Sequence, residues 1–200
     1  MTRHRPPSSG RPERHLVAAA ETADRDRFAT IVAPTFSAVR VRPLADGTFH
    51  SSLRSAVAGE VRVSVLSGSP CVVTRGPELI HLTDPAFLAV SLQRAGRAAV
   101  AQDGRHCMLG PGDLVNYVTS RPYEVTFWEP YEVVVVTVPL AALGSHTDTL
   151  AGRTAIAVGT ERGPRDVVGT LLDALAAKID DCTPGDAGRR PPAPAGSAPP

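Results

Sequence analysis

The stretch AAVAQDGRHCMLGPGDLVNYVT, residues 98–119, decides the fold class of this chain of 200 residues. It contains three short β runs separated by two turn signals. The Asp103-Gly104 dipeptide is typical of a tight hairpin. In the Gly110-Pro111-Gly112-Asp113 turn, proline fixes φ, glycine accepts a positive φ and aspartate caps the turn. Three strands joined by such short turns predict an antiparallel β architecture.

Further β runs extend this pattern on both sides. They cover residues 39–44, 48–56, 61–65, 71–75, 87–94, 122–128 and 131–138. The last run contains Val133–Val136, which is apolar on both faces and therefore predicts a central strand. The fold class that follows is mainly β, a sandwich or barrel over residues 24–140.

Helices are expected at both ends of this barrel. Phe28, Ile31, Val32 and Phe36 have helical spacing and predict a short amino-terminal helix. Residues 141–181 are predicted to form a helical segment, followed by a disordered Pro/Ala tail over 182–200. Residues 1–20, rich in arginine and proline at their start, are predicted to be a disordered arm.

The carboxy-terminal helix from Pro164 to Asp180 is predicted to dimerise the protein. The apolar stripe on this helix is wider than packing against one edge of the barrel requires. Side chains of the stripe that face solvent would form an exposed apolar patch. The alternative is that the helix caps its own barrel. The residues assigned to dimerisation are Val168, Leu171, Leu172, Leu175 and Ile179.

Composition limits the function classes. A formal net charge of +1 gives no reason to expect nucleic acid or an anionic membrane as a partner. The three cysteines, Cys71, Cys107 and Cys182, suit neither a disulfide framework nor a zinc ribbon. No signal peptide and no apolar run long enough for a membrane helix is found, so we expect a cytoplasmic protein. Arginine, alanine and proline usage suggests a bacterial genome of high GC content.

The chain lacks the motifs of the common enzyme classes. A metal-binding cupin needs a His-x-His pair, but the six histidines, His4, His15, His50, His81, His106 and His146, include no two at that spacing. No nucleophile elbow, phosphate loop or dinucleotide fingerprint occurs. We therefore predict a non-enzymatic protein with no catalytic residues, no metal and no cofactor.

Several segments together resemble the ligand-binding domain of AraC-type transcription regulators. They are 100–105, 109–115 and 119–123, preceded by the helix around Phe28, the 72–75 strand and 92–96, and followed by 135–140. The resemblance covers residues 27–179 and rests on the order of these pieces. The resemblance implies a cupin-like (double-stranded β-helix or jelly-roll) barrel that senses an effector and dimerises. The helix-turn-helix half of such regulators is not found, so we expect no direct DNA binding by this chain alone.

Polar residues on otherwise apolar strands are the candidate ligand-binding set. They are Arg75, Gln93, Gln102, Tyr117, Arg121 and Tyr123. Strand parity places Gln93 on the face of Ala89 and Ser91, whose small side chains leave room inside the barrel. An arginine there would suit an anionic effector, with Arg75 or Arg121 as counter-ion. The alternatives are a solid core, a cupin-superfamily isomerase or dioxygenase, and a barrel without ligand that binds a partner.

Overall fold

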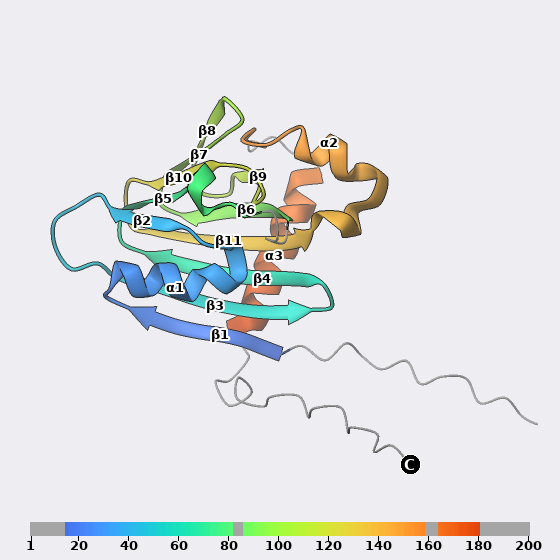
Figure 1. The fold of residues 1–200 in the computed structure, drawn as a ribbon. Coiled ribbons are helices and arrows are strands. Elements are labelled where there is room, and N and C mark those ends of the chain that lie inside the picture. The colour runs from blue at the N-terminus through green and yellow to red at the C-terminus, as the bar shows by residue number, and fades with distance from the viewer. Residues whose placement is uncertain (1–14, 82–85, 159–163, 181–200) are drawn as a thin grey trace, which may run out of the picture.

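The computed structural model describes residues 15–81, 86–158 and 164–180. Two antiparallel sheets face each other (Figure 1). The six-stranded sheet has the order β1-β3-β4-β11-β6-β9, and the five-stranded sheet has the order β2-β5-β10-β7-β8. The first comprises β1 (His15–Thr22), β3 (Ser51–Ala58), β4 (Val61–Gly68), β11 (Tyr131–Pro139), β6 (Phe87–Ala95) and β9 (Leu114–Val118). The second comprises β2 (Arg40–Pro43), β5 (Cys71–Arg75), β10 (Tyr123–Phe127), β7 (Ala98–Gln102) and β8 (Arg105–Leu109).

The predicted fold class is confirmed, and the turn chemistry of the 98–119 stretch explains one hairpin and one crossing between the sheets. Asp103 and Gly104 have φ values of 53° and 71°, as the tight turn between β7 and β8 requires. Gly112 has a φ of 86°, and the Asp113 carboxylate accepts a hydrogen bond of 2.8 Å from the Gly110 backbone nitrogen. The first turn sets the register of β7 and β8, and the second leads the chain from β8 to β9 in the other sheet.

The prediction of a central strand at Val133–Val136 is confirmed by the position of β11 between β4 and β6. Val133 and Val135 belong to the core between the two sheets, whereas Val134 and Val136 belong to a second core on the outer face of the six-stranded sheet. Because neighbouring positions face opposite layers that are both apolar, the Val133–Val136 stretch is apolar on both faces.

Helices cover the two faces of the six-stranded sheet (Figure 1). The helix α1 (Arg25–Phe36) begins at Asp24, whose carboxylate accepts hydrogen bonds from the backbone nitrogens of Asp26 and Arg27. Phe28, Val32 and Phe36 of α1 enter the core between the sheets. On the other side, α3 (Pro164–Asp180) packs on the outer face. Three shorter elements complete the fold: η1 (Pro77–Leu79), η2 (Leu140–His146) and α2 (Thr147–Ala151).

The apolar stripe of α3 is divided by this packing. Leu172 and Ile179 are buried against the six-stranded sheet, and Leu175 is half-buried beside them. Their own sheet covers Leu172 and Ile179 in this structure, and their assignment to a dimer contact stays a prediction. Val168 and Leu171 remain exposed, at 38% and 55%. The part of the stripe with Leu172 and Ile179 packs on its own barrel, as the capping alternative expects. The part with Val168 and Leu171 is exposed.

The boundary of the predicted amino-terminal arm needs a correction. Residues His15–Thr22 form β1, which pairs with β3 at the edge of the sheet. Pairing with a distant strand stabilises this segment, and no local pattern announces that pairing. Residues 1–14 and the expected tail over 182–200 lie outside the described residues. In the part of the chain that the structure describes, no helix is both long and apolar enough to cross a membrane.

Candidate functional site

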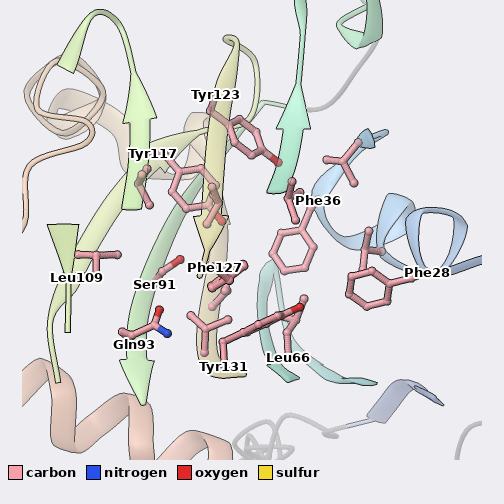
Figure 2. A pocket seen from close by; sticks show the side chains of 17 residues that line it. Phe28, Phe36, Leu66, Ser91, Gln93, Leu109, Tyr117, Tyr123, Phe127 and Tyr131 are labelled. Carbon is pink, nitrogen blue, oxygen red and sulfur yellow. The ribbon is translucent and has the colours of Figure 1, made fainter. Parts of the chain in front are cut away.

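A cavity of about 50 Å³ lies between the two sheets, with one wall formed by α1. Figure 2 shows its labelled side chains gathered around one space, with Phe28 and Phe36 opposite Ser91, Gln93 and Leu109. The lining is aliphatic and aromatic except for a few polar groups, and no lining residue is a carboxylate, lysine, arginine or histidine. The lining residues are Phe28, Val32, Phe36, Val39, Leu66, Val73, Ser91, Gln93, Val100, Leu109, Tyr117, Tyr123, Val125, Phe127, Tyr131, Val133 and Val135.

Three of the six candidate residues line this cavity, namely Gln93, Tyr117 and Tyr123. Gln93 lies on β6 on the same face as Ser91, as strand parity predicts, and both are buried. Tyr117 comes from β9 and Tyr123 from β10, so that one tyrosine belongs to each sheet. Their ring centroids are 4.9 Å apart and the rings are inclined by 43°. These two rings form part of the aromatic wall of the cavity.

The polar groups of the lining are engaged to different degrees. The Tyr117 hydroxyl lies beside Ser91, whose hydroxyl partly offsets the rise that burial causes in the pKa of Tyr117. The Gln93 amide nitrogen donates to the Ala95 carbonyl oxygen at 2.7 Å. No hydrogen bond joins the Tyr123 hydroxyl to another described residue, and Tyr123, which is 5% exposed, lines the cavity. A buried hydroxyl without a protein partner is the kind of group that binds a ligand or a water molecule.

All three tyrosines of the chain line this cavity. Burial raises the pKa of Tyr117, Tyr123 and Tyr131, since a phenolate would lose its hydration there. The hydroxyls are therefore protonated at neutral pH and act as hydrogen-bond donors. Burial also raises the pKa of the Cys71 thiol, next to Tyr131, to about 11. That thiol is neutral at pH 7 and unsuited to nucleophilic chemistry.

Arg75 is fully buried, at 0% exposure, but does not line the cavity. Its Nε donates to the Thr119 carbonyl oxygen at 2.8 Å and its Nη1 to the Ala38 carbonyl oxygen at 2.6 Å. It therefore joins the β9–β10 turn to the residue that follows α1 and Ser37. This engagement leaves the predicted anionic ligand without the counter-ion that Arg75 was expected to supply.

Gln102 is likewise buried and committed to backbone groups. Its amide nitrogen donates to the Val118 carbonyl oxygen at 2.8 Å, and its amide oxygen accepts from the Val118 nitrogen at 2.8 Å. The same amide nitrogen lies 3.3 Å and 3.2 Å from the carbonyl oxygens of Arg121 and Pro122. Gln102 thus supports the β9–β10 turn from β7, and the structure keeps it away from the cavity lining.

Arg121 lies in a partly exposed charged cluster, which we call the Asp103 cluster and which comprises Asp103, Arg105, Arg121 and Thr154. The Arg121 Nη1 is 2.9 Å from the Asp103 carboxylate, and its Nη2 donates to the Ala151 carbonyl oxygen. Thr154 donates to the same carboxylate at 2.9 Å, and the Arg105 Nε donates to the Thr154 carbonyl oxygen at 2.7 Å. The cluster fastens the β7–β8 hairpin to the segment after α2, outside the cavity.

The cavity also depends on residues that the sequence argument passed over, chiefly the aromatic ones. Phe127 and Tyr131 stack with centroids 3.8 Å apart at 13°, and α1 contributes Phe28 and Phe36. The alternation of β10 places Tyr123, Val125 and Phe127 on one buried face, so period-2 parity was the available signal. Among the described residues, no group of three His, Cys, Asp or Glu side chains is placed to hold a metal ion.

A family model described as the AraC-binding-like domain matches residues 28–193. The chain belongs to this family. The fold agrees with the crystal structure of the AraC-like transcriptional activator CuxR, with a TM-score of 0.69 and 17% identity over 83% of this chain and 63% of that one. An ethanolamine utilization protein from Salmonella typhimurium also matches, at 11% identity over 44% of this chain and 69% of that one, with a TM-score of 0.37.

A curated relative from Bacillus sp. (strain OxB-1), an uncharacterized protein in the nit 5'region, is 26% identical over 160 residues. The match covers 78% of this chain and 62% of that protein, so the chain spans less than two thirds of this relative. The AraC-binding-like family model and the fold shared with CuxR support a regulator ligand-binding domain of cupin type. They leave the ligand and the assembly of the chain open.

Proposed function

We propose that this chain is the effector-sensing and dimerisation domain of an AraC-type transcription regulator, without catalytic activity. The observation that carries this is the cavity between the sheets, whose otherwise apolar lining includes a buried Tyr123 hydroxyl without a protein partner. Apolar cavities with a few convergent polar groups are typical ligand sites. The family membership supports a regulatory role for such a ligand. The cytoplasmic location and the absence of cofactor and metal stay predictions.

The lining also favours binding over catalysis. An acid–base or nucleophilic reaction needs a group whose pKa lies near the working pH. The lining tyrosines have raised pKa values and the neighbouring Cys71 thiol titrates at about 11, so none of them is charged near pH 7. The cupin enzyme alternative therefore finds no support among the described lining residues.

A matched pair of substitutions on β10 tests the cavity as the effector site. Val125 faces the cavity, whereas its neighbour Thr126 lies on the opposite face of the strand. Val125→Phe should fill the cavity and abolish small-molecule binding, and Thr126→Phe should leave it intact. Native mass spectrometry and thermal shifts against a metabolite library measure both, with circular dichroism to confirm folding. Equal binding by the two folded variants would contradict the cavity as the site.

Dimerisation is proposed through the exposed part of α3, against a second copy of the chain. Val167, Val168 and Leu171 are 71%, 38% and 55% exposed, an unusual concentration of apolar side chains on one helix. Val168→Lys with Leu171→Lys should give a folded monomer by light scattering. Ala174→Lys with Ala177→Lys is the control, since these exposed alanines lie farther along the same helix. An unchanged dimer in the first variant would contradict this contact.

A further inference from the structure

The polar groups of the cavity lining keep hydrogen-bonding capacity for a ligand. The Ala95 carbonyl oxygen can only accept, so its 2.7 Å bond to Gln93 fixes which end of the Gln93 amide is nitrogen. The Gln93 Oε1 accepts no hydrogen bond within the described residues and is the acceptor that remains. Ser91 and Tyr117 interact through their hydroxyls, which uses one of their two donors. Gln93 Oε1 is an acceptor of the lining, and Tyr123 Oη a donor, that no described residue engages.

The Tyr123 hydroxyl has a physical reason to bind a ligand acceptor. A buried hydrogen-bonding group without a partner costs stability, which a suitable ligand atom recovers. The neighbouring guanidinium of Arg75 acts on Tyr123 as a charge. Its Nε and Nη1, however, are directed to the carbonyl oxygens of Thr119 and Ala38. A ligand acceptor therefore satisfies Tyr123 without displacing that network.

The absence of charge in the described lining selects against ionic ligands. Burying a carboxylate without a counter-charge costs several kcal/mol, and no lysine, arginine or histidine lines the cavity. A sugar is also disfavoured, because its several hydroxyls would meet mostly valine, leucine and phenylalanine side chains. Aromatic faces are abundant instead, from the Tyr117–Tyr123 and Phe127–Tyr131 pairs.

The size of the cavity limits the ligand further. A volume of about 50 Å³ is far below that of a pocket for a drug-sized molecule. One wall is α1, which contributes Phe28, Val32 and Phe36. Within the described residues no backbone hydrogen bond joins α1 to a strand, so side-chain packing holds this wall in place. A ligand the size of one aromatic ring needs more room than the cavity has, and α1 is the wall that can yield without breaking such a bond.

We propose that the effector is a small, uncharged, mainly apolar molecule that accepts a hydrogen bond from Tyr123 Oη and donates one to Gln93 Oε1. This inference rests on the proposed function and makes these two residues the determinants of specificity. It replaces the anionic effector expected from the sequence.

Five probes of similar size separate the ligand classes in calorimetric titrations of the whole chain. They are 4-hydroxyacetophenone with donor and acceptor, acetophenone lacking the donor, 4-ethylphenol lacking the carbonyl acceptor, 4-hydroxybenzoate with a negative charge, and xylose as a polyol. We expect 4-hydroxyacetophenone to bind tightest. Acetophenone and 4-ethylphenol should bind about five- to tenfold more weakly, and the last two weakest of all.

Two conservative variants assign each preference to its residue. Tyr123→Phe should remove the advantage of 4-hydroxyacetophenone over 4-ethylphenol, and Gln93→Met its advantage over acetophenone. Tyr117→Phe is the control and should keep both preferences, because the Tyr117 hydroxyl already has Ser91 as partner. Preferences that survive both variants, tighter binding of 4-hydroxybenzoate or xylose, or no binding of any neutral probe would each overturn this ligand class. The proposed function would still stand if another compound bound Thr126→Phe and failed to bind Val125→Phe.

Discussion

The cavity between the sheets and the β9–β10 turn at the end of the barrel both bury polar side chains, but they use them differently. At the turn, Arg75 and Gln102 direct their donors to the backbone carbonyl oxygens of Ala38, Val118 and Thr119. In the cavity, the Tyr123 hydroxyl and the Gln93 amide oxygen have no protein partner among the described residues. The polar side chains at the turn have hydrogen-bond partners, whereas two polar atoms of the cavity lining have none among the described residues.

This difference separates stability from recognition. A buried polar group whose hydrogen bonds all go to the backbone holds the fold together, and removing it leaves the carbonyl oxygens unpaired. A buried polar group without a partner costs stability and keeps its bonding capacity for a ligand. Polar residues that look alike in sequence thus have opposite expected effects when they are replaced.

The largest effect is expected from Arg75→Ala. The change leaves the Thr119 and Ala38 carbonyl oxygens without their donors and opens a void at a residue that is 0% exposed. Unfolding in urea should show a loss of about 2–5 kcal/mol. Arg40→Ala is the control, because the Arg40–Glu78 ion pair is exposed and should contribute less than about 1 kcal/mol. A loss from Arg75→Ala no larger than this control would show that the turn network does not hold the barrel end.

High pH should weaken the fold through the cavity. Burial raises the pKa of all three tyrosines and of Cys71, so these groups stay protonated in the folded chain while the unfolded chain releases its protons. Their contribution is fully present below the unfolded pKa values and is lost as pH rises above about 9 for Cys71 and about 10 for the tyrosines.

Urea unfolding at a series of pH values, together with tyrosinate absorbance, measures this loss. Each tyrosine should remove about 1.4 kcal/mol per pH unit above pH 10 until its folded pKa is reached. Cys71→Ala should delay the first part of the decline to higher pH. A stability that stays flat from pH 9 to 11 would mean that the tyrosines are open to solvent.

A smaller and opposite pair of effects should distinguish the two tyrosines that face each other. Tyr117→Phe removes a hydroxyl that interacts with Ser91 and should cost about 0.5–1.5 kcal/mol. Tyr123→Phe removes an unpartnered hydroxyl, so stability should stay unchanged or rise by up to about 1 kcal/mol. Both are measured by urea unfolding of the chain without ligand. Equal losses in the two variants would indicate that Tyr123 has a partner after all.

The sequence predicts the strands better than the direction of their polar side chains. Turn residues such as Asp103-Gly104 act locally, so the β7–β8 hairpin follows from a few residues. Parity places Gln93 inside, since the period of a strand is fixed. The destination of Arg75 depends on the Ala38 carbonyl oxygen, 37 residues away in sequence, which no local pattern contains. The edge strand β1 was missed for the same reason, because its partner β3 decides its structure.

The smallest effect is expected from the Asp103 cluster, where charges meet at the surface instead of in the interior. The Asp103 carboxylate lies 2.9 Å from Arg121 and 3.5 Å from Arg105, but all three side chains are one-quarter or more exposed. Asp103→Asn removes the charge and keeps a residue that tolerates the positive φ of 53°. We expect a loss of about 0.5–1 kcal/mol that shrinks in high salt, because exposed ion pairs are screened.

Glu129→Gln, which breaks the exposed Arg97–Glu129 pair at 2.9 Å, is the control and should have a weaker effect. Hydrogen exchange should speed up around Thr154, which loses a charged acceptor, and stay unchanged at the cavity strands. A loss of several kcal/mol that persists in high salt would place this cluster with the buried network of Arg75, and the contrast between the interior and the surface would fail.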